Sequence, residues 1–255
     1  MRSQRIEEIK KYIYENKTVT LDEICENFQV SKSTLRRDLN AILQSSDIKK
    51  IYGGVTALPQ KGLVSFEERN ISNLEAKRRI AAAAAGLIQE NDIIFIDSGT
   101  TTLPLIDFIT EKKNITILTN NVEIIMHAIP FENINVISLS GTLSRKTLSF
   151  TGASAVQVLQ NYNISKAFMA TTGFSIVNGV TNSSPSESDI KRAVVQRSQK
   201  VVLLADSSKC NTISLITYCG LDQINTLVTD AYPSKEICNY IRNSGNEILI
   251  AEKLP

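Results

Sequence analysis

The feature that most restricts the fold is a series of short apolar runs separated by stretches with helical spacing. The apolar runs are Ile93–Ile96, Ile115–Leu118, Val136–Leu139, Ala167–Ala170, Val201–Leu204, Leu227–Val228 and Ile248–Ile250. The main helical stretches are Glu75–Gln89, Asn121–Ala128, Ser186–Arg197 and Ser234–Asn243. Short apolar strands that alternate with crossover helices form a mostly parallel sheet covered on both faces. We therefore expect an α/β domain over residues 74–255, with ligands at the carboxyl ends of its strands.

The first 57 residues predict three helices followed by a hairpin. Isoleucines recur at helical spacing over Ser3–Glu15, a capping box at Thr20–Glu23 opens a second helix that ends near Phe28, and Ser31 caps a third. The apolar stripe of the third helix is Leu35, Leu39 and Ile42. Ile48–Val55 resembles a hairpin whose Gly-Gly pair supplies positive φ or a close backbone approach. Two short helices followed by a hairpin form a winged helix-turn-helix.

The charge of the chain is nearly balanced, with 28 Lys and Arg against 26 Asp and Glu, and the small excess lies within the first 57 residues. The third helix is basic on the side opposite its apolar stripe. Arginine forks onto guanine edges, while Ser, Thr and Lys mostly contact phosphates, so this face predicts binding to double-stranded DNA. A merely solvated helix face is the alternative. The candidate DNA contacts are Lys32, Ser33, Thr34, Arg36, Arg37, Asn40, Lys49, Lys50 and Tyr52.

The segment between the two regions has a different character. Leu58–Asn73 contains Pro59 and Gly62 and has no sustained hydrophobic period, which is typical of a linker or a docking segment. We therefore expect a DNA-binding domain over residues 1–57, a linker over 58–73 and the α/β domain from 74 onward.

Several classes of protein are excluded by what the sequence lacks. No run approaches the ~20 apolar residues of a transmembrane helix, and the N-terminus has no apolar centre of a signal peptide, so we expect a cytoplasmic protein. Four cysteines lie far apart and His127 is the only histidine. This spacing predicts reduced thiols, with no zinc site, disulfide framework or bound cofactor.

The strongest candidate for a ligand site follows the first apolar run. Ile93–Ile96 leads into Asp97, Ser98, Gly99, Thr100, Thr101 and Thr102, and Pro104 stands in the first turn of the helix that follows. Free backbone N–H groups, the positive end of a helix and threonine hydroxyls form a site for an anion such as phosphate. A well-capped helix after a strand is the alternative.

Other strand ends bring further polar residues to the same edge of the sheet. Lys209 suits a phosphate or carboxylate and Asp206 suits a sugar hydroxyl, unless the two pair with each other. Glu187 and Lys191 lie on one expected helix, where they are either pocket residues or an ordinary i,i+4 pair. The remaining candidates are turn glycines first and ligand contacts second, namely Gly141 and Gly173.

Together these residues resemble the DeoR-type bacterial transcriptional regulators, from about Arg5 to Ile250. The motifs that carry the resemblance are Val30–Leu39, Tyr52-Gly53-Gly54, Asp97–Thr102, Thr119-Asn120-Asn121 and Ala205–Lys209. The resemblance implies a sensor domain related to ribose-5-phosphate isomerase and glucosamine-6-phosphate deaminase, which binds phosphorylated sugars or polyols and controls operons for their catabolism. It adds Asn120 to the candidate effector contacts. The segments that look closest to the inositol-catabolism repressors are Tyr52–Val55, Phe66–Arg69 and Lys166–Met169.

Two departures from the family pattern stand near the expected pocket. Ala170–Gly173 replaces a turn that often contains an acidic residue, and Ser140-Gly141 replaces a double glycine. The first departure removes an acidic group from the pocket, and the second puts a backbone contact at Gly141 in doubt.

We expect a homo-oligomeric repressor, a dimer or tetramer, that a phosphorylated sugar-like effector releases from operator DNA. Activation is an alternative to repression. The alternative from another class is a sugar-phosphate isomerase with an added DNA-binding domain, which needs a positioned carboxylate to move a proton. On the isomerase template that carboxylate falls near Lys191, with Glu187 one turn away. A lysine there favours a sensor without catalytic residues.

Overall fold

The computed structural model describes residues 2–16, 18–45, 48–51, 53–57 and 66–252. The chain divides into two compact units, Met1–Gly62 and Leu63–Pro255. Tyr52 and the first part of the expected linker, 58–65, lie outside the described residues.

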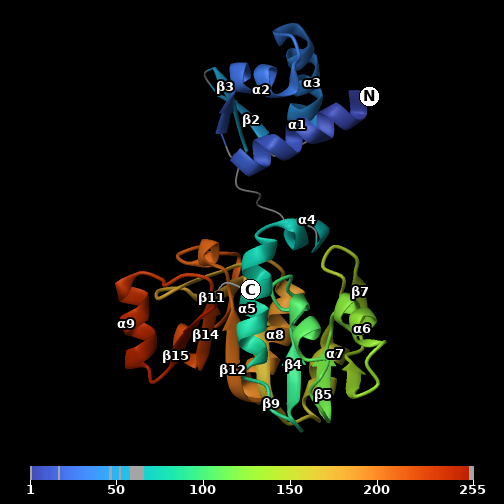
Figure 1. Cartoon of the computed structure of the whole chain (residues 1–255), viewed down its shortest axis with the longest axis vertical. Helices are drawn as coiled ribbons and strands as arrows, with labels where there is room; N and C mark the ends of the chain where they lie inside the picture. Colours follow the sequence, from blue (N-terminus) through green and yellow to red (C-terminus); the bar gives the residue numbers. More distant parts are fainter. Residues whose placement is uncertain (1, 17, 46–47, 52, 58–65, 253–255) are drawn as a thin grey trace. The chain divides into compact units, whose positions relative to one another are not determined.

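The first unit is a winged helix-turn-helix, as expected (Figure 1). Its helices are α1 (Arg2–Asn16), α2 (Leu21–Phe28) and α3 (Lys32–Ser45). Its strands are β1 (Thr18–Thr20), β2 (Ile48–Ile51) and β3 (Gly54–Ala57), which form an antiparallel sheet in the order β1-β3-β2. The sequence predicts the hairpin but not β1, because a strand of three residues has too few positions to show a period.

Local sequence signals set the ends of these elements. Thr20 and Glu23 form the expected capping box, in which the Glu23 amide donates to Thr20 Oγ1 at 3.2 Å and the Thr20 amide donates to Glu23 Oε2 at 2.7 Å. Gln29 ends α2 in the left-handed conformation, with φ of 50°. At Gly54 a Cβ atom would lie 2.3 Å from the carbonyl oxygen of Val19, so only glycine lets β3 approach β1 this closely.

The second unit is built on a seven-stranded parallel sheet in the order β15-β14-β12-β9-β4-β5-β6. The strands are β4 (Ile93–Ile96), β5 (Ile115–Thr119), β6 (Ile134–Ser138), β9 (Ile164–Ala170), β12 (Ser198–Leu204), β14 (Thr226–Thr229) and β15 (Glu247–Ile250). Every apolar run expected to form a strand therefore lies in this sheet, and the α/β fold class is confirmed.

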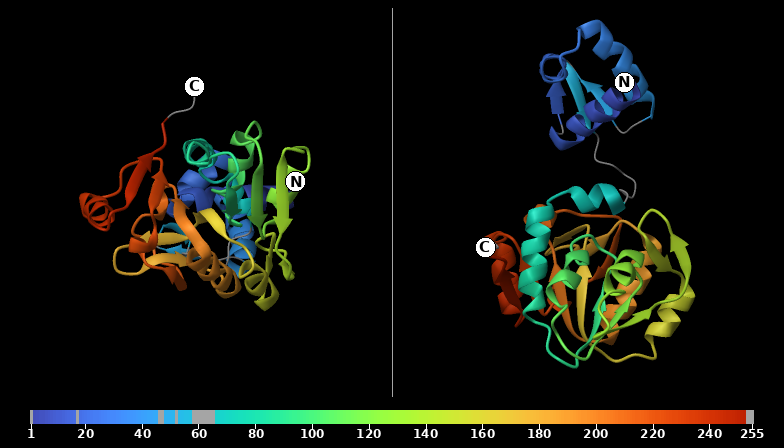
Figure 2. Two further views of the ribbon diagram at one scale, coloured as in Figure 1. Left: turned by 90° about the horizontal axis from the view of Figure 1, so that it is seen from below. Right: turned by 45° about the vertical axis from the view of Figure 1, so that its right-hand side comes forward.

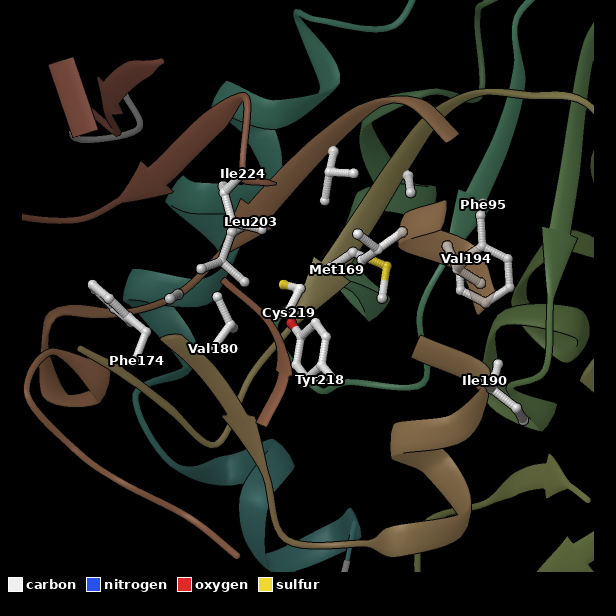
Figure 3. Packing of buried hydrophobic residues seen from close by; sticks show 14 of the residues in the cluster. Phe95, Met169, Phe174, Val180, Ile190, Val194, Leu203, Tyr218, Cys219 and Ile224 are labelled. Atoms are coloured by element: carbon white, nitrogen blue, oxygen red, sulfur yellow. The ribbon is translucent and has the colours of Figure 1, made fainter. Parts of the chain in front are cut away.

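Alternate residues along the central strands face two separate apolar cores. Phe95 and Met169 belong to one core, whereas Ile94 and Phe168 belong to the other. Helices α7 (Ala153–Leu159), α8 (Pro185–Arg197) and α9 (Lys235–Asn243) cover the first core. Helix α5 (Leu74–Ala85), the 3-10 helix η1 (Leu103–Phe108) and α6 (Val122–Ala128) cover the second. Figure 2 shows this three-layer arrangement, and Figure 3 shows the side chains of the first core.

Two small antiparallel sheets were not expected from the sequence. Strands β10 (Gly173–Ser175), β11 (Gly179–Asn182) and β13 (Ile216–Cys219) form one, and β7 (Thr142–Ser144) and β8 (Ser149–Thr151) form the other. Short 3-10 helices follow β12 and β13 at η2 (Ser207–Lys209) and η3 (Leu221–Gln223). These elements have three or four residues, too few for a hydrophobic period to identify them.

The segment expected to be a linker contains a further helix, α4 (Phe66–Ile71). Phe66 is only 3% exposed and belongs to the second core, and its amide donates to the carbonyl of Lys146 at 2.9 Å. Residues 66–71 therefore belong to the second unit by packing, which is the docking behaviour that the sequence left open. Among the helices of the described residues, none is long and apolar enough to cross a membrane.

Candidate functional site

The exposed face of α3 carries most of the predicted DNA contacts. Leu35, Leu39 and Ile42 are buried in the core of the first unit. On the opposite side the exposed side chains are Lys32, Ser33, Arg36, Arg37 and Asn40, with Thr34 half-buried. Lys49 and Lys50 are exposed on β2. This helix therefore presents a row of donors beside a basic strand, the arrangement with which a recognition helix enters a major groove.

Two ion pairs hold α3 against the other helices. Asp38 is 1% exposed and accepts from Nε of Arg5 on α1 at 2.8 Å. At the start of α3, Lys32 Nζ lies 2.6 Å from Asp22 Oδ1 on α2, and this hydrogen bond raises the pKa of Lys32. Any DNA phosphate that contacts the Lys32 ammonium therefore has to compete with Asp22 for it.

The second unit contains an open pocket at the carboxyl ends of β4 and β9. About 230 Å³ of space free of protein atoms lies in and above it, open solvent included, and the enclosed cavity itself is about 20 Å³. Its lining residues are Arg69, Ser98, Gly99, Ala170, Thr171, Thr172, Asn182, Glu187 and Lys191. The enclosed volume of about 20 Å³ has room for about one water molecule and lies far below the ~300–1,000 Å³ of most ligand sites, so a larger ligand has to occupy the open part of the pocket.

Glu187 is the acidic residue in this lining, and its carboxylate is held by three side chains. Its Oε1 accepts from Ser98 Oγ at 2.9 Å and from Ser149 Oγ at 3.0 Å, while Oε2 accepts from Asn182 Nδ2 at 3.4 Å. Ser184 caps α8 and positions Glu187 in its first turn. Glu187 is buried, with only 6% of the residue exposed. It is thus fixed as an acceptor for a ligand hydroxyl.

Lys191 lies one turn further along α8 and is paired inside the protein. Its Nζ donates to Asp97 Oδ2 and, at 3.1 Å, to the carbonyl of Ala170. The same carbonyl accepts from the Tyr218 hydroxyl at 3.0 Å, and burial raises the pKa of that hydroxyl well above its ordinary value. The predicted pair of Glu187 and Lys191 is therefore not an i,i+4 ion pair in this structure: each has other partners.

The loop after β4 has the features of an anion site. The amide N–H groups of Ser98–Thr101 donate to no acceptor among the described residues. Gly99 lies against β9, where a Cβ atom would come within 2.0 Å of the Ala170 Cβ, so a side chain cannot be accommodated. The Thr102 hydroxyl turns back to the carbonyls of Asp97 and Gly99, at 2.6 and 2.8 Å. The Thr102 hydroxyl therefore stabilises the turn of the loop, and the amides of Ser98–Thr101 remain available to bind a ligand.

Arg69 reaches the pocket from α4. Its Nε and Nη2 atoms are buried and have no hydrogen-bond partner among the described residues. Burial lowers the pKa of this guanidinium, and the nearby carboxylates of Glu187 and Asp97 oppose that change. Phe66 lies beneath it, with the guanidinium carbon 5.7 Å from the ring centroid.

The other predicted effector contacts are not among the lining residues. Thr100 and Thr101 are buried beside the loop amides, Asn120 donates to the carbonyl of Phe150 at 3.1 Å, and Gly141 stands in the exposed turn before β7. Gly173 begins β10.

Asp206 and Lys209 also lie outside the lining. Asp206 caps η2 through the amide of Ser208 at 3.1 Å and accepts from Asn73 Nδ2 at 3.2 Å. The loop after β12 is thereby tied to the turn between α4 and α5.

Several lining residues carry no clear signal in the sequence. Arg69 stands in the segment expected to be a linker, although the Phe66–Arg69 motif already drew attention to it. Thr171 and Thr172 were seen only as a departure from the family pattern. Asn182 gave no signal, because the hairpin that carries it was not expected.

Proteins that match this chain over most of its length include regulators of transcription. Residues 5–61 match the DeoR-like helix-turn-helix domain, and residues 72–231 match the DeoR C terminal sensor domain. The chain is 42% identical over 240 residues to the HTH-type transcriptional regulator IolR of Bacillus subtilis (strain 168), covering 94% of this chain and 96% of that protein. It is 28% identical to the HTH-type transcriptional repressor GlcR of the same organism, covering 98% and 96%.

Among solved structures, a D-ribose-5-phosphate isomerase in complex with phospho-erythronic acid matches 52% of this chain and 53% of its own, at 16% identity and a TM-score of 0.40. A similarity of this size carries no argument about activity.

Proposed function

Because the chain belongs to the DeoR family of transcriptional regulators, we propose that it represses a carbohydrate or polyol catabolic operon and is released by a phosphorylated sugar-like effector. It acts as a homo-oligomer on repeated half-sites in the cytoplasm, since one winged helix buries too little DNA for a tight specific site. The sequence resemblance to the inositol-catabolism repressors makes inositol catabolites the first compounds to test.

The effector proposal rests on two kinds of binding group near one small pocket, namely amide donors for an anion and a carboxylate acceptor for a hydroxyl. The loop amides of Ser98–Thr101 are free to bind an anion, and the Glu187 carboxylate is fixed nearby as a hydroxyl acceptor. A phosphorylated sugar or polyol carries both a phosphate and hydroxyls. Charge-assisted hydrogen bonds to each end would orient it in one direction.

The same geometry favours sensing over catalysis. Among the described lining residues Glu187 is the acid, and it lies one turn before Lys191, the position near which the isomerase template places its carboxylate. Lys191 is committed to Asp97. An aldose–ketose isomerase needs a carboxylate free to take up a proton from its substrate. Turnover of ribose 5-phosphate at an enzymatic rate by the purified protein would contradict this proposal.

The direct test is calorimetry of the full chain with phosphorylated sugars and inositol catabolites, each beside its unphosphorylated counterpart. We expect the phosphorylated member of one pair to bind far more tightly. Glu187→Gln should weaken its binding, while Arg78→Ala on the exposed side of α5 serves as the control. Equal affinity for both members of every pair would refute the phosphate anchor.

A further inference from the structure

We infer that Arg69 is the cation that binds the anionic group of the ligand, and that α4 is therefore the element through which an occupied pocket is sensed. This inference rests on the proposed function, because it assigns a residue to the same pocket. It differs from the expectation that the cation is Lys209, which lies on the loop after β12 and outside the lining.

The charged lining residues differ in whether a protein partner already neutralises them. Lys191 is neutralised by Asp97, with 4% and 1% of the two side chains exposed. Glu187 is held by two hydroxyls and an amide. Arg69 forms no ion pair with a described residue, and two of its guanidinium nitrogens are buried without an acceptor. Arg69 is thus the cation of the described lining that has hydrogen-bond donors to spare.

The buried guanidinium of Arg69 also favours an anion on energetic grounds. Burying a charged group without a partner is costly, and the cost falls when a counter-charge supplies hydrogen bonds. Glu187 and Asp97 attract the guanidinium from a distance, but neither forms a bond with it. A phosphate or carboxylate accepts two parallel N–H bonds from an arginine, a geometry that Lys cannot supply. An anion in the pocket would therefore satisfy Arg69 and the loop amides of Ser98–Thr101 together.

Arg69 lies on the first described helix after the DNA-binding unit in the chain. Helix α4 begins at Phe66, while the first unit ends at Gly62. The helix has six residues and is held by Phe66 in the apolar core and by Lys77 Nζ, which donates to the Arg69 carbonyl. Such a short helix has little stability of its own, so a further bond from Arg69 to a ligand changes how firmly α4 is held. The ligand then acts on the helix that follows the DNA-binding unit in the chain.

The test compares Arg69→Met, Arg69→Lys and the control Arg78→Met in the full chain. Inorganic phosphate is the first probe and acetate the second, so that a phosphate site is distinguished from a general carboxylate site. We expect Arg69→Met to bind phosphate roughly 10- to 100-fold more weakly than wild type, as the loss of a charged hydrogen-bonding pair implies. Arg69→Lys should fall between them, and Arg78→Met should match wild type.

Hydrogen exchange provides a readout that a merely structural role would not change. Phosphate should slow exchange of the α4 amides in wild type and in Arg78→Met, but not in Arg69→Met. If Arg69→Met is unstable, Arg69→Lys serves alone, because it keeps the charge and loses the bidentate geometry. Unchanged phosphate affinity and α4 protection in a folded Arg69 variant would overturn the inference. If Arg69→Met binds a phosphorylated sugar as tightly as wild type does, the inference is overturned and the proposed function stands. If wild type binds no phosphorylated sugar, the proposed function itself is contradicted.

Discussion

Asn73 Nδ2 lies 3.2 Å from Asp206 Oδ1, so the turn between α4 and α5 is hydrogen-bonded to the loop that follows β12. Asp206 is 1% exposed, and its other carboxylate oxygen is buried without a partner among the described residues. Nearby, Lys77 is attracted by Asp206 and donates to the Arg69 carbonyl. A residue that the sequence suggested for a sugar hydroxyl thus also supports the helix that carries Arg69.

Asp206→Ala should destabilise the second unit by about 1–3 kcal/mol, because it leaves Asn73 and the Ser208 amide without their acceptor. Lys209→Ala, on the same 3-10 helix, is the matched control and should cost less. Urea denaturation measures both. Equal stability of the two variants would show that the Asn73 contact contributes nothing.

Arg36→Ala and Arg37→Ala should each weaken operator binding without unfolding the protein, because both side chains are exposed on α3. A base-reading arginine is worth about 1–3 kcal/mol, whereas Lys49→Ala should instead reduce the salt dependence of binding by about one unit of slope. Fluorescence anisotropy on selected operator DNA at several salt concentrations separates these effects. Lys200→Ala, an exposed lysine of the second unit, is the control. Wild-type affinity in both arginine variants would rule out this face of α3.

Because Lys77 is buried, we expect the free energy of unfolding to depend on pH. Burial lowers its pKa from 10.5 to about 8. Between these values the unfolded chain binds a proton that the folded chain does not, so the contribution of Lys77 to the free energy of unfolding rises with pH there and is constant below about 8. The stability of wild type relative to Lys77→Met should therefore increase between pH 8 and pH 10 in urea titrations. A difference that does not change with pH would contradict the burial of this ammonium.

Self-association should be measurable in the absence of DNA. Light scattering is expected to give a multiple of the 28.2 kDa chain mass. Val177 is 90% exposed and Leu215 is 73% exposed, and both adjoin the antiparallel sheet of β10, β11 and β13. If this surface is the interface, Val177→Asp and Leu215→Asp should shift the mass toward 28.2 kDa, with Lys235→Asp as a control elsewhere on the surface. Particles of 28.2 kDa alone, with and without DNA, would exclude an oligomer.

The sequence predicts the strands that show a clear apolar pattern and the helices that begin with a clear capping residue. The alternation of Phe95 and Ile94 between two cores is a consequence of strands buried on both faces, which read as continuous apolar runs. The capping box of Thr20 and Glu23 likewise fixes the start of α2. The helical spacing predicts that α5 reaches Gln89, but the helix ends at Ala85, because the amides of Gly86, Leu87 and Ile88 donate to the carbonyls three residues before them instead of four.

The pocket was predictable only in part. The loop after β4 has a local signal, since a strand, a glycine and hydroxyl residues precede a helix. Arg69 and Asn182 come from short elements whose positions depend on tertiary packing, and no local period marks them. The sequence also gives no local signal for the partners of Lys191, because Asp97 lies 94 residues away in the chain.

The most direct test of the whole account is the affinity of the full chain for operator DNA with and without a saturating phosphorylated sugar identified by calorimetry. Binding must be coupled in both directions, so the factor by which the sugar weakens DNA binding equals the factor by which DNA weakens sugar binding. We predict a decrease in DNA affinity with the phosphorylated sugar, none with its unphosphorylated counterpart, and an equal reciprocal factor. Identical affinity of the sugar for free and DNA-bound protein would contradict the role of this pocket as the regulatory switch.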